Sequence, residues 1–358
     1  MKVSIVLGTR PEIVKFAPII RECEKRGINY FIVHTGQHYD YNLDKVFFED
    51  LKLPKAKYNL EVGSGYYGEQ LNKMITRLKE VFQNEKPDVV LVLGDTSTTL
   101  AGAMAAHKLG IKIGHIESGL RSYEIMFEEI HRVISGIIGD YLFVPTEKSK
   151  QNLLKENINE NKIFVTGNTI VDATLQNIEL TNNNILEKLN IKPNEYIAIT
   201  AHRPEYVDKK DELSNTLKAL DILSNNHKII FPLHPRTRKN ITKFGLKIPD
   251  KVITTEPMGY MDFLSLMNNS KLVLTDSGGI QEETCIIKKP CVTLRNATER
   301  PETIEAGSNM TAGTNPDKII ECVEIMLNKE RNWENPFGDG NSGKKIMDIL
   351  EKEFTISQ

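Results

Sequence analysis

Acidic side chains follow apolar runs in the first half of the chain, at points where the strands of a parallel sheet would end. Asp95 comes directly after VVLVLG, Glu117 comes after IKIGHI, and Glu128 lies within FEEIHR. In open parallel α/β sheets, ligands bind outside the carboxyl ends of the strands. Taken singly, Asp95 fits a helix N-cap and Glu128 suits the helix dipole, whereas a Glu at a strand end, such as Glu117, caps poorly. Several carboxylates at one sheet edge can have shifted proton affinities, so the set as a whole indicates acid–base chemistry.

A glycine turn follows the first apolar run, in GTRPE (8–12). Gly8 permits a tight turn, and Pro11 can begin a helix. Arg10 then lies where a helix N-terminus already attracts anions, and Lys15 follows one turn into that helix. In isolation, the segment fits a plain strand–helix turn with a solvated arginine equally well.

The second half of the chain supplies groups that suit a nucleotide. His202 follows YIAITA, and the segment TDSGGIQEE follows another apolar run. Gly278 and Gly279, between a strand and a helix, would expose N–H groups that cradle a diphosphate, and Ser277 would add a hydroxyl donor. Glu283, one turn into that helix, is placed to accept hydrogen bonds from ribose hydroxyls. Together with the carboxylates of the first half, these groups predict an enzyme that acts on a nucleotide-diphosphate sugar.

The elements that must position these groups are strands of parallel sheets. Short continuous apolar runs suit parallel strands that are covered on both faces, and the helical patterns between them imply right-handed βαβ units. We therefore predict an α/β fold of two Rossmann-like, doubly wound parallel-sheet domains that face a central cleft. The expected strands are 3–7, 30–34, 89–94, 111–116, 141–144 and 163–165 in the first half, and 196–201, 228–233, 251–254, 271–275, 290–294 and 308–311 in the second.

A polar stretch interrupts this pattern after GNTIVDATL and marks a domain junction near Thr169. We expect an N-terminal domain of residues 1–168 plus 341–358, which carries the carboxylates, and a C-terminal domain of residues 169–340, which binds the nucleotide. An amphipathic helix at 344–354 is expected to pack back across the first domain. Two domains suit 358 residues, because single cores stop growing near ~250–300 residues.

Composition excludes several classes of protein. The formal charge is −2, and hydrophobic residues make up 40%, which is typical of a globular protein and not of a basic nucleic-acid-binding one. No apolar run approaches the ~20 residues of a membrane helix, and the first residues read as a strand and not as a signal peptide. The cysteines are Cys23, Cys285, Cys291 and Cys322. Because they lack CxxC or metal-site spacing, we expect reduced thiols in a cytoplasmic protein.

Sequence signatures of common cofactors are also missing. No GxxxxGK[ST] occurs, so a P-loop is not expected. No GxGxxG follows the first expected strand, so a tightly bound NAD is not expected either. Zinc-type ligand spacing is absent, and we therefore predict an enzyme without a metal or an organic cofactor.

A set of short motifs, in this order, resembles that of the non-hydrolysing UDP-N-acetylglucosamine 2-epimerases along essentially the full chain. The motifs are GTRPE (8–12), GDTSTTLAG (94–102), HIESGLRS (115–122), EEIHR (128–132), VPTE (144–147), TGNTIVDA (166–173), AHRPE (201–205), LHPRT (233–237), TDSGGIQEE (275–283) and TERPE (298–302). The resemblance implies the GT-B fold, which many glycosyltransferases share, and a homodimer.

The same resemblance implies an isomerase that interconverts UDP-GlcNAc and UDP-ManNAc for polysaccharide biosynthesis. UDP would leave by anti elimination across C1 and C2, which gives 2-acetamidoglucal, and would then add back with the proton on the opposite face. Such a reaction needs no redox cofactor. Removal and return of the proton on opposite faces call for two acid/base groups, which would explain several carboxylates.

Roles of individual residues follow from the resemblance alone. The residues proposed as proton-transfer acids in the family correspond to Asp95, Glu117 and Glu128 of this chain. A histidine that lies near the diphosphate in the family's catalytic site corresponds to His202. The UDP contacts fall on Arg10, Ser277, Gly278, Gly279 and Glu283, and a further position implicated in activity falls on Lys15. Two positions of a second, activating UDP-GlcNAc site fall on Gln37 and His38.

The chain departs from the family pattern at two places. Phe127 and His131 stand where the family usually has Pro and Asn, which leaves room for a modified sugar such as a 3-acetamido or uronate derivative. Pro204 and Tyr206 alter the segment that helps to form the activating site in bacterial members. The sequence therefore does not predict allosteric activation.

Other functions remain open from the sequence. The same 2-epimerisation could act on UDP-2,3-diacetamido-2,3-dideoxyglucuronate. A hydrolysing relative would release free ManNAc and UDP, and a GT-B glycosyltransferase would move the sugar to an acceptor. A regulator that only binds UDP-sugars is disfavoured, because Asp95, Glu117, Glu128 and His202 are all retained.

Overall fold

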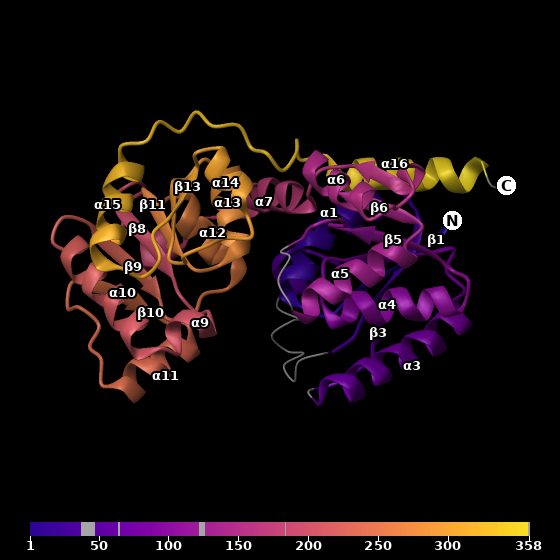
Figure 1. The fold of residues 1–358 in the computed structure, drawn as a ribbon, viewed down its shortest axis with the longest axis horizontal. Helices are drawn as coiled ribbons and strands as arrows, with labels where there is room; N and C mark the ends of the chain where they lie inside the picture. The colour runs from indigo at the N-terminus through magenta and orange to yellow at the C-terminus, as the bar shows by residue number, and fades with distance from the viewer. Residues whose placement is uncertain (37–46, 64, 122–125, 183, 357–358) are drawn as a thin grey trace. The chain divides into compact units, whose positions relative to one another are not determined.

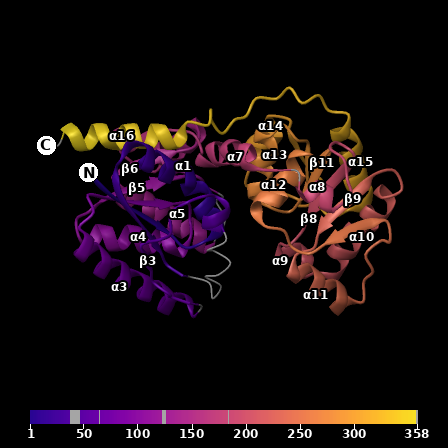
Figure 2. The same ribbon diagram turned by 180° about the vertical axis from the view of Figure 1, so that it is seen from behind.

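The computed structural model describes residues 1–36, 47–63, 65–121, 126–182 and 184–356. The chain forms two compact units, Met1–Ala173 with Phe337–Gln358 and Thr174–Pro336. Each unit is built around one parallel sheet with helices on both faces (Figure 1 and, from behind, Figure 2). The chain passes from the first unit to the second within α7 (Thr169–Leu180).

In the described residues, the N-terminal unit has a seven-stranded sheet in the order β3-β2-β1-β4-β5-β6-β7. The central strand β4 is buried along its whole length, as its uninterrupted VVLVL sequence predicts for a strand covered on both faces. Its Val89 pairs in parallel with Val3 on one side and with Lys112 on the other. The strands are β1 (Lys2–Leu7), β2 (Asn29–His34), β3 (Tyr58–Asn59), β4 (Val89–Leu93), β5 (Lys112–Ile116), β6 (Tyr141–Val144) and β7 (Ile163–Val165).

Helices form a layer on each face of this sheet (Figure 1). On one face, α3 buries Met74, Leu78, Val81 and Phe82, which recur at the spacing of one helical stripe, against apolar side chains of the sheet. Helix α4 lies beside α3 in this layer, and α5 lies beside α4. The helices are α1 (Arg10–Arg26), α3 (Tyr67–Glu85), α4 (Ser97–Lys108), α5 (Phe127–Ile138), α6 (Glu147–Lys155) and α16 (Ser342–Ile356), with a 3₁₀ turn at Glu160–Lys162.

The last helix, α16, packs against α1 of the N-terminal unit. Arg26 of α1 forms ion pairs with Asp348 and Glu351 of α16 at 2.7 and 2.6 Å. Gly343 lies so close to α1 that a Cβ at this position would be 3.1 Å from the Pro18 backbone. A glycine at the start of α16 therefore permits the close approach of the two helices.

The C-terminal unit has, in its described residues, a six-stranded parallel sheet in the order β10-β9-β8-β11-β12-β13. Apolar side chains of α10 and α15 pack on one face of the sheet, and those of α8 and α12 pack on the other. The strands are β8 (Tyr196–Thr200), β9 (Lys228–Pro232), β10 (Val252–Thr255), β11 (Leu272–Thr275), β12 (Cys291–Thr293) and β13 (Asn309–Thr311). The helices are α8 (Asn184–Lys188), α9 (Pro204–Val207), α10 (Lys210–Leu223), α11 (Pro235–Phe244), α12 (Tyr260–Asn268), α13 (Gly278–Ile286), α14 (Pro301–Glu305) and α15 (Pro316–Leu327).

The predicted fold class is confirmed, and every expected strand is present to within one residue at either end. Strand β3 was missed, so the first sheet has seven strands where the sequence predicted six. This strand has only two residues, which pair with Val33 and His34, and no apolar run marks it. Within the described part of the chain, no helix is long and apolar enough to cross a membrane.

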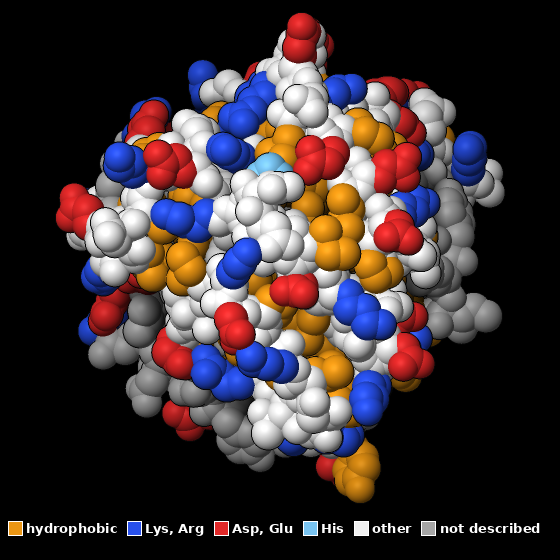
Figure 3. Space-filling view, turned by 90° about the vertical axis from the view of Figure 1, so that its left-hand side faces the viewer, with side chains coloured by type: hydrophobic (Ala, Val, Ile, Leu, Met, Phe, Trp, Pro, Cys, Tyr) orange, Lys and Arg blue, Asp and Glu red, His pale blue; other side chains and the backbone are white. Residues whose placement is uncertain are grey.

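Charged side chains of both signs are interspersed over the face of the C-terminal unit that Figure 3 shows. Apolar side chains lie between them, and neither basic nor acidic residues dominate this face of the described residues. The pattern agrees with the formal charge of −2. It differs from the basic stripe that phosphate-backbone binding requires.

Candidate active site

Three neighbouring strands bring the predicted groups of the N-terminal unit to one sheet edge. Strands β1, β4 and β5 are adjacent and parallel, so the segments that follow them leave the sheet at the same edge. Arg10 follows β1, Asp95 follows β4, and Glu117 follows β5. The strand order reverses between β1 and β4, which is the topological switch point where α/β sheets bind ligands.

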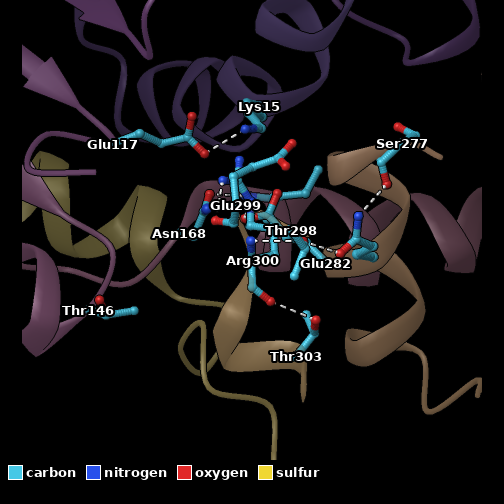
Figure 4. A network of polar contacts seen from close by, with 12 residues as sticks. Lys15, Glu117, Thr146, Asn168, Ser277, Glu282, Thr298, Glu299, Arg300 and Thr303 are labelled. Carbon is cyan, nitrogen blue, oxygen red and sulfur yellow. Dashed lines mark hydrogen bonds and ion pairs between the residues drawn. The ribbon is translucent and has the colours of Figure 1, made fainter. Parts of the chain in front are cut away.

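Glu117 forms a nearly buried ion pair with Lys15 of α1 (Figure 4). The Nζ of Lys15 lies 2.5 Å from Oε1 of Glu117, and the two side chains are 12% and 5% exposed. Glu117 also has a left-handed backbone with φ of 61°, which is costly for a residue with a side chain. Such conformations persist only where the surroundings enforce them, and they cluster at functional sites. The pair therefore holds one carboxylate in a defined place beside a fixed positive charge.

Asp95 is held by Arg132 of α5, which also binds Glu129 at 2.8 Å. The Asp95 side chain is 30% exposed, so one carboxylate remains accessible at the sheet edge. Glu128 is exposed and lies in the first turn of α5, not at the end of a strand. Burial, followed by the negative charge of Glu128, raises the pKa of Tyr67. Asp95 and Glu117 thus share one sheet edge, whereas Glu128 lies on α5, where its charge acts on Tyr67.

Glu12 joins two of the site loops, a role that was not predicted from the sequence. Its carboxylate accepts hydrogen bonds from the backbone N of Gly8 and Thr9 at 2.9 and 2.8 Å, and from Thr96 Oγ1 at 2.7 Å. Burial raises the pKa of Glu12, and these hydrogen bonds oppose that effect. The sequence signal for this role was the Thr-x-x-Glu spacing of a capping box, which Thr9 and Glu12 form at the N-terminus of α1.

In the C-terminal unit, the buried Asp276 holds the segment that carries His202. Its Oδ2 accepts hydrogen bonds from the backbone N of His202 and Arg203 at 2.6 and 2.7 Å. The Nδ1 of His202 lies 3.3 Å from the other carboxylate oxygen. His202 follows β8 and Asp276 follows β11, the two strands at which the order of this sheet reverses. A half-exposed imidazole is therefore fixed at the second switch point, with its ring centroid 5.4 Å from that of His234.

The N-terminus of α13 presents backbone groups that suit an anion. Ser277 is the N-cap residue, but its side chain does not cap the helix. A Cβ on Gly279 would meet nothing within 4 Å, so a ligand can approach this backbone closely. A Cβ on Gly278 would instead lie 2.3 Å from Oε1 of Glu299. Gly279 therefore fits the predicted cradle, whereas a side chain at Gly278 would displace the carboxylate of Glu299 (labelled in Figure 4).

Arginines surround Glu299 beside this helix. Arg295 Nη1 lies 2.5 Å from Glu299 Oε2, and Arg203 Nη2 lies 3.2 Å from Oε1. Burial alone would raise the pKa of Glu299, but the charges of Arg295 and then Arg300 and Arg203 hold it below its usual range. Arg300 is in turn 2.8 Å from the buried Glu282. Arg203 and Glu299 lie within the motifs AHRPE (201–205) and TERPE (298–302), but no role was predicted for either residue from the sequence.

The remaining predicted residues have these positions. Arg10 is exposed, with its guanidinium 5.5 Å from the Phe47 ring centroid. Glu283 is 5% exposed and lies beside Tyr260, whose pKa is raised well above its usual value by burial and then by the charge of Glu283. Gln37 and His38 lie outside the described residues. Within those residues, no group of three or more His, Cys, Asp and Glu could hold a metal ion.

Replacement of Asp276 should destabilise the C-terminal unit. Asp276→Ala leaves the N–H groups of His202 and Arg203 without their acceptor, which should lower the free energy of unfolding by about 2–4 kcal/mol. Asp276→Asn keeps one carbonyl oxygen and should cost less. Trp333 is the only tryptophan, is buried in this unit and donates to the Cys285 carbonyl at 3.0 Å, so urea unfolding followed by its fluorescence measures the effect.

The matched control is Asp250→Ala, because the Asp250 side chain is 81% exposed. This variant should unfold within about 0.5 kcal/mol of wild type. Equal urea midpoints for Asp276→Ala and Asp250→Ala would contradict the structural role of Asp276.

His115 should make the N-terminal unit less stable in acid. Burial lowers its pKa to about 4, against 6.5 for the free side chain. The unfolded chain therefore binds more protons between these values, and stability present above pH 6.5 is lost as the pH falls toward 4. The loss should reach about 3 kcal/mol, at 1.36 kcal/mol per pH unit. In His115→Gln, an amide can still donate to the Gly94 carbonyl, which His115 Nε2 contacts at 2.9 Å, but it does not titrate.

Urea unfolding of wild type and His115→Gln at pH 7 and pH 4.5, followed by circular dichroism, gives the comparison. The wild type should lose more stability on acidification than the variant. A difference between the two proteins that does not change with pH would show that His115 does not carry this effect.

The sequence matches the family model for UDP-N-acetylglucosamine 2-epimerase over residues 21–351. A UDP-N-acetylglucosamine 2-epimerase of Methanocaldococcus jannaschii is 54% identical over 361 aligned residues, which cover 98% of this chain and 99% of that protein. A UDP-2,3-diacetamido-2,3-dideoxy-D-glucuronate 2-epimerase of Pseudomonas aeruginosa is 37% identical, with 98% and 100% covered.

The fold agrees with these sequence relationships. The crystal structure of the M. jannaschii UDP-GlcNAc 2-epimerase in complex with UDP-GlcNAc and UDP is similar with a TM-score of 0.88 at 53% identity. The similarity covers 98% of this chain and 100% of that one. The resemblance seen in the motifs is therefore confirmed, and the chain belongs to the UDP-N-acetylglucosamine 2-epimerase family.

Proposed function

We propose that this protein interconverts UDP-GlcNAc and UDP-ManNAc by elimination and re-addition of UDP. The observation that carries the proposal is the placement of Asp95 and Glu117 at one sheet edge, with Glu117 paired to Lys15 at 2.5 Å, in a member of this epimerase family. Two carboxylates at a switch point supply what a reaction with two proton transfers needs.

The chemistry follows from the weak acidity of the C2 proton. A carboxylate removes this proton while the C1–oxygen bond to UDP breaks, and the electron pair forms the C1=C2 double bond of 2-acetamidoglucal. In the return step, the UDP oxygen attacks C1 and an acid on the opposite face protonates C2. The electron count of the sugar is unchanged over the cycle, so the reaction itself requires no oxidant.

We assign the two halves of the substrate to the two units. The N-terminal domain, 1–168 plus 341–358, handles the sugar. The C-terminal domain, 169–340, binds UDP. The proposed acid/base groups are Asp95, Glu117 and Glu128, and Lys15 stabilises the ionised Glu117. The proposed UDP contacts are Arg10, Ser277, Gly278, Gly279 and Glu283, with His202 beside the diphosphate.

The N-terminus of α13 supports the UDP assignment. Helix N-terminal N–H groups have no partner within the helix, and they favour negative charge. The open space at Gly279 and the absence of a Ser277 side-chain cap leave these groups available. The contact of Asp276 with the His202 imidazole orients that ring, which supports its placement beside the diphosphate.

A modified sugar is the second candidate substrate. The P. aeruginosa relative is named for UDP-2,3-diacetamido-2,3-dideoxy-D-glucuronate, and it aligns with 98% of this chain. The higher identity of the M. jannaschii relative, 54% against 37%, favours UDP-GlcNAc. We further propose that the enzyme acts in the cytoplasm, where its four unpaired and buried cysteines stay reduced, and supplies UDP-ManNAc for polysaccharide synthesis.

A proton NMR time course with UDP-GlcNAc in D₂O tests the chemistry. The wild type should form UDP-ManNAc with deuterium at C2. Asp95→Asn, Glu117→Gln and His202→Ala should each lower kcat by about 10²–10⁴-fold, because each removes a group that assists proton transfer or departure of UDP.

Near-wild-type turnover in all three variants would refute the site assignment. If C2 of UDP-GlcNAc neither exchanges nor inverts, the diacetamido-uronate sugar is the next substrate to test. Free ManNAc among the products would indicate hydrolysis, and sugar transfer only in the presence of an acceptor would indicate a glycosyltransferase.

We also propose that the protein is a homodimer that associates through α5. Three large apolar side chains of this helix are exposed: Phe127 at 59%, Ile130 at 50% and Ile137 at 57%. Met104 of α4, the neighbouring helix, is 40% exposed. Exposed apolar residues gathered on adjacent helices are typical of a protein–protein interface.

Light scattering coupled to size-exclusion chromatography tests this association. The wild type should have twice the mass of one chain, and Ile130→Glu with Ile137→Glu should give monomers, because two buried charges would oppose the interface. Ile222→Glu in α10, where the isoleucine is equally exposed at 50%, serves as the control and should remain dimeric. A monomeric wild type, or the same dissociation in the control, would disprove an α5 interface.

A further inference from the structure

The turn that carries Asp95 is held by buried side chains on both sides. The Nε2 of His115 on β5 lies 2.9 Å from the carbonyl of Gly94, the residue before Asp95. Thr96, the residue after Asp95, donates through Oγ1 to Glu12 at 2.7 Å. His115 and Glu12 are 0% and 2% exposed. The residues next to Asp95 are therefore fixed by two different elements.

His131 of α5 holds Asp95 itself. Its Nδ1 lies 2.7 Å from the backbone carbonyl oxygen of Asp95, and the imidazole is 3% exposed. A carbonyl oxygen only accepts hydrogen bonds, so Nδ1 must carry the proton. In the neutral ring, Nε2 is then an acceptor, and Tyr67 Oη at 2.5 Å must be its donor. Burial raises the pKa of Tyr67, which keeps this hydroxyl protonated.

Ring packing restricts this chain of hydrogen bonds further. Tyr67 and His131 are nearly parallel, with an interplanar angle of 6° and centroids 5.8 Å apart. Phe127 stacks on the ring of Tyr67 at 4.6 Å. The donor from α3 therefore has little freedom to rotate away, and His131 is held in one orientation.

Two neighbouring residues of α5 thus bind the backbone and the side chain of Asp95. His131 binds the Asp95 carbonyl, and the next residue, Arg132, binds its carboxylate. Glu128 lies in the first turn of the same helix, three residues before His131. A shift of α5 relative to β4 would therefore move the Asp95 carboxylate and Glu128 with respect to each other.

We propose that His131, supported by Tyr67, is a positioning residue that sets the geometry of Asp95 and Glu128 for proton transfer. The proposal rests on the function assigned above. It predicts a loss in kcat and not in substrate binding, because the Tyr67–His131–Asp95 chain acts on the carboxylates and not on the UDP-binding unit. A displacement of about 1 Å is enough to cost roughly 100-fold in rate.

Three variants separate the steps of the chain. His131→Leu removes both hydrogen bonds, His131→Asn retains an amide that can donate to the Asp95 carbonyl, and Tyr67→Phe removes only the outer donor. His107→Leu is the matched control, since His107 is an exposed histidine in the last turn of α4. Circular dichroism establishes that each variant is folded before it is compared.

Steady-state kinetics provide the first measurement. His131→Leu should lower kcat about 100-fold with KM within about threefold of wild type. His131→Asn should recover a large part of the loss, and Tyr67→Phe should fall between wild type and His131→Leu. The control should match wild type. Wild-type kcat in His131→Leu, or an equal loss in the Asn and Leu variants, would overturn the proposal.

Hydrogen exchange provides a measurement that does not depend on the substrate. Mass spectrometry of peptides covering residues 94–99 should show about tenfold faster exchange in folded His131→Leu than in wild type or the control. Unchanged exchange there would overturn the positioning role, even if kcat falls. If the wild type does not turn over UDP-GlcNAc, the proposed function fails, and the exchange experiment alone decides whether His131 positions the Asp95 turn.

Discussion

The parallel pairing of β1 with β4 is the constraint on which the site of the N-terminal unit depends. Because these strands are neighbours and β5 follows β4, the chain must leave the sheet three times along one short edge. Arg10, Asp95 and Glu117 follow these three strands. A carboxylate pair that is widely separated in sequence is thus brought together by the order of the strands, and the side chains need only local adjustment.

The carboxylates of Glu117 and Asp95 are each held in position by an ion pair with a positively charged side chain. Lys15 holds Glu117 at 2.5 Å, and Arg132 holds Asp95 while it also binds Glu129. Each carboxylate therefore has a positive partner within the same unit. Preorganised charges of this kind cost no reorganisation when the reaction begins, which is why fixed partners favour catalysis more than mobile ones.

The strands of both sheets could be predicted because most of them are uninterrupted apolar runs in the sequence. Asp95 and Glu117 could be assigned to one sheet edge because each directly follows such a run. The Lys15–Glu117 pair could not be predicted, since it spans 102 residues and depends on the left-handed backbone of Glu117. The His131 contact was equally hidden, because its acceptor is a backbone carbonyl, which any residue type supplies. The role of Glu12 could have been predicted from its capping-box spacing to Thr9. The two-residue strand β3 could not, because no apolar run in the sequence marks it.

In both units, a buried carboxylate accepts hydrogen bonds from the backbone N–H groups that follow a strand. The first residues after β1 are held by Glu12, which accepts the N–H groups of Gly8 and Thr9, and those after β8 are held by Asp276, which accepts the N–H groups of His202 and Arg203. Each carboxylate is at most 2% exposed. Backbone N–H groups at such a turn would be costly to bury without an acceptor, and a charged acceptor binds them strongly. In each unit, a buried acid that binds backbone N–H groups therefore fixes the loop that carries a more exposed residue of the proposed site, Arg10 after β1 and His202 after β8.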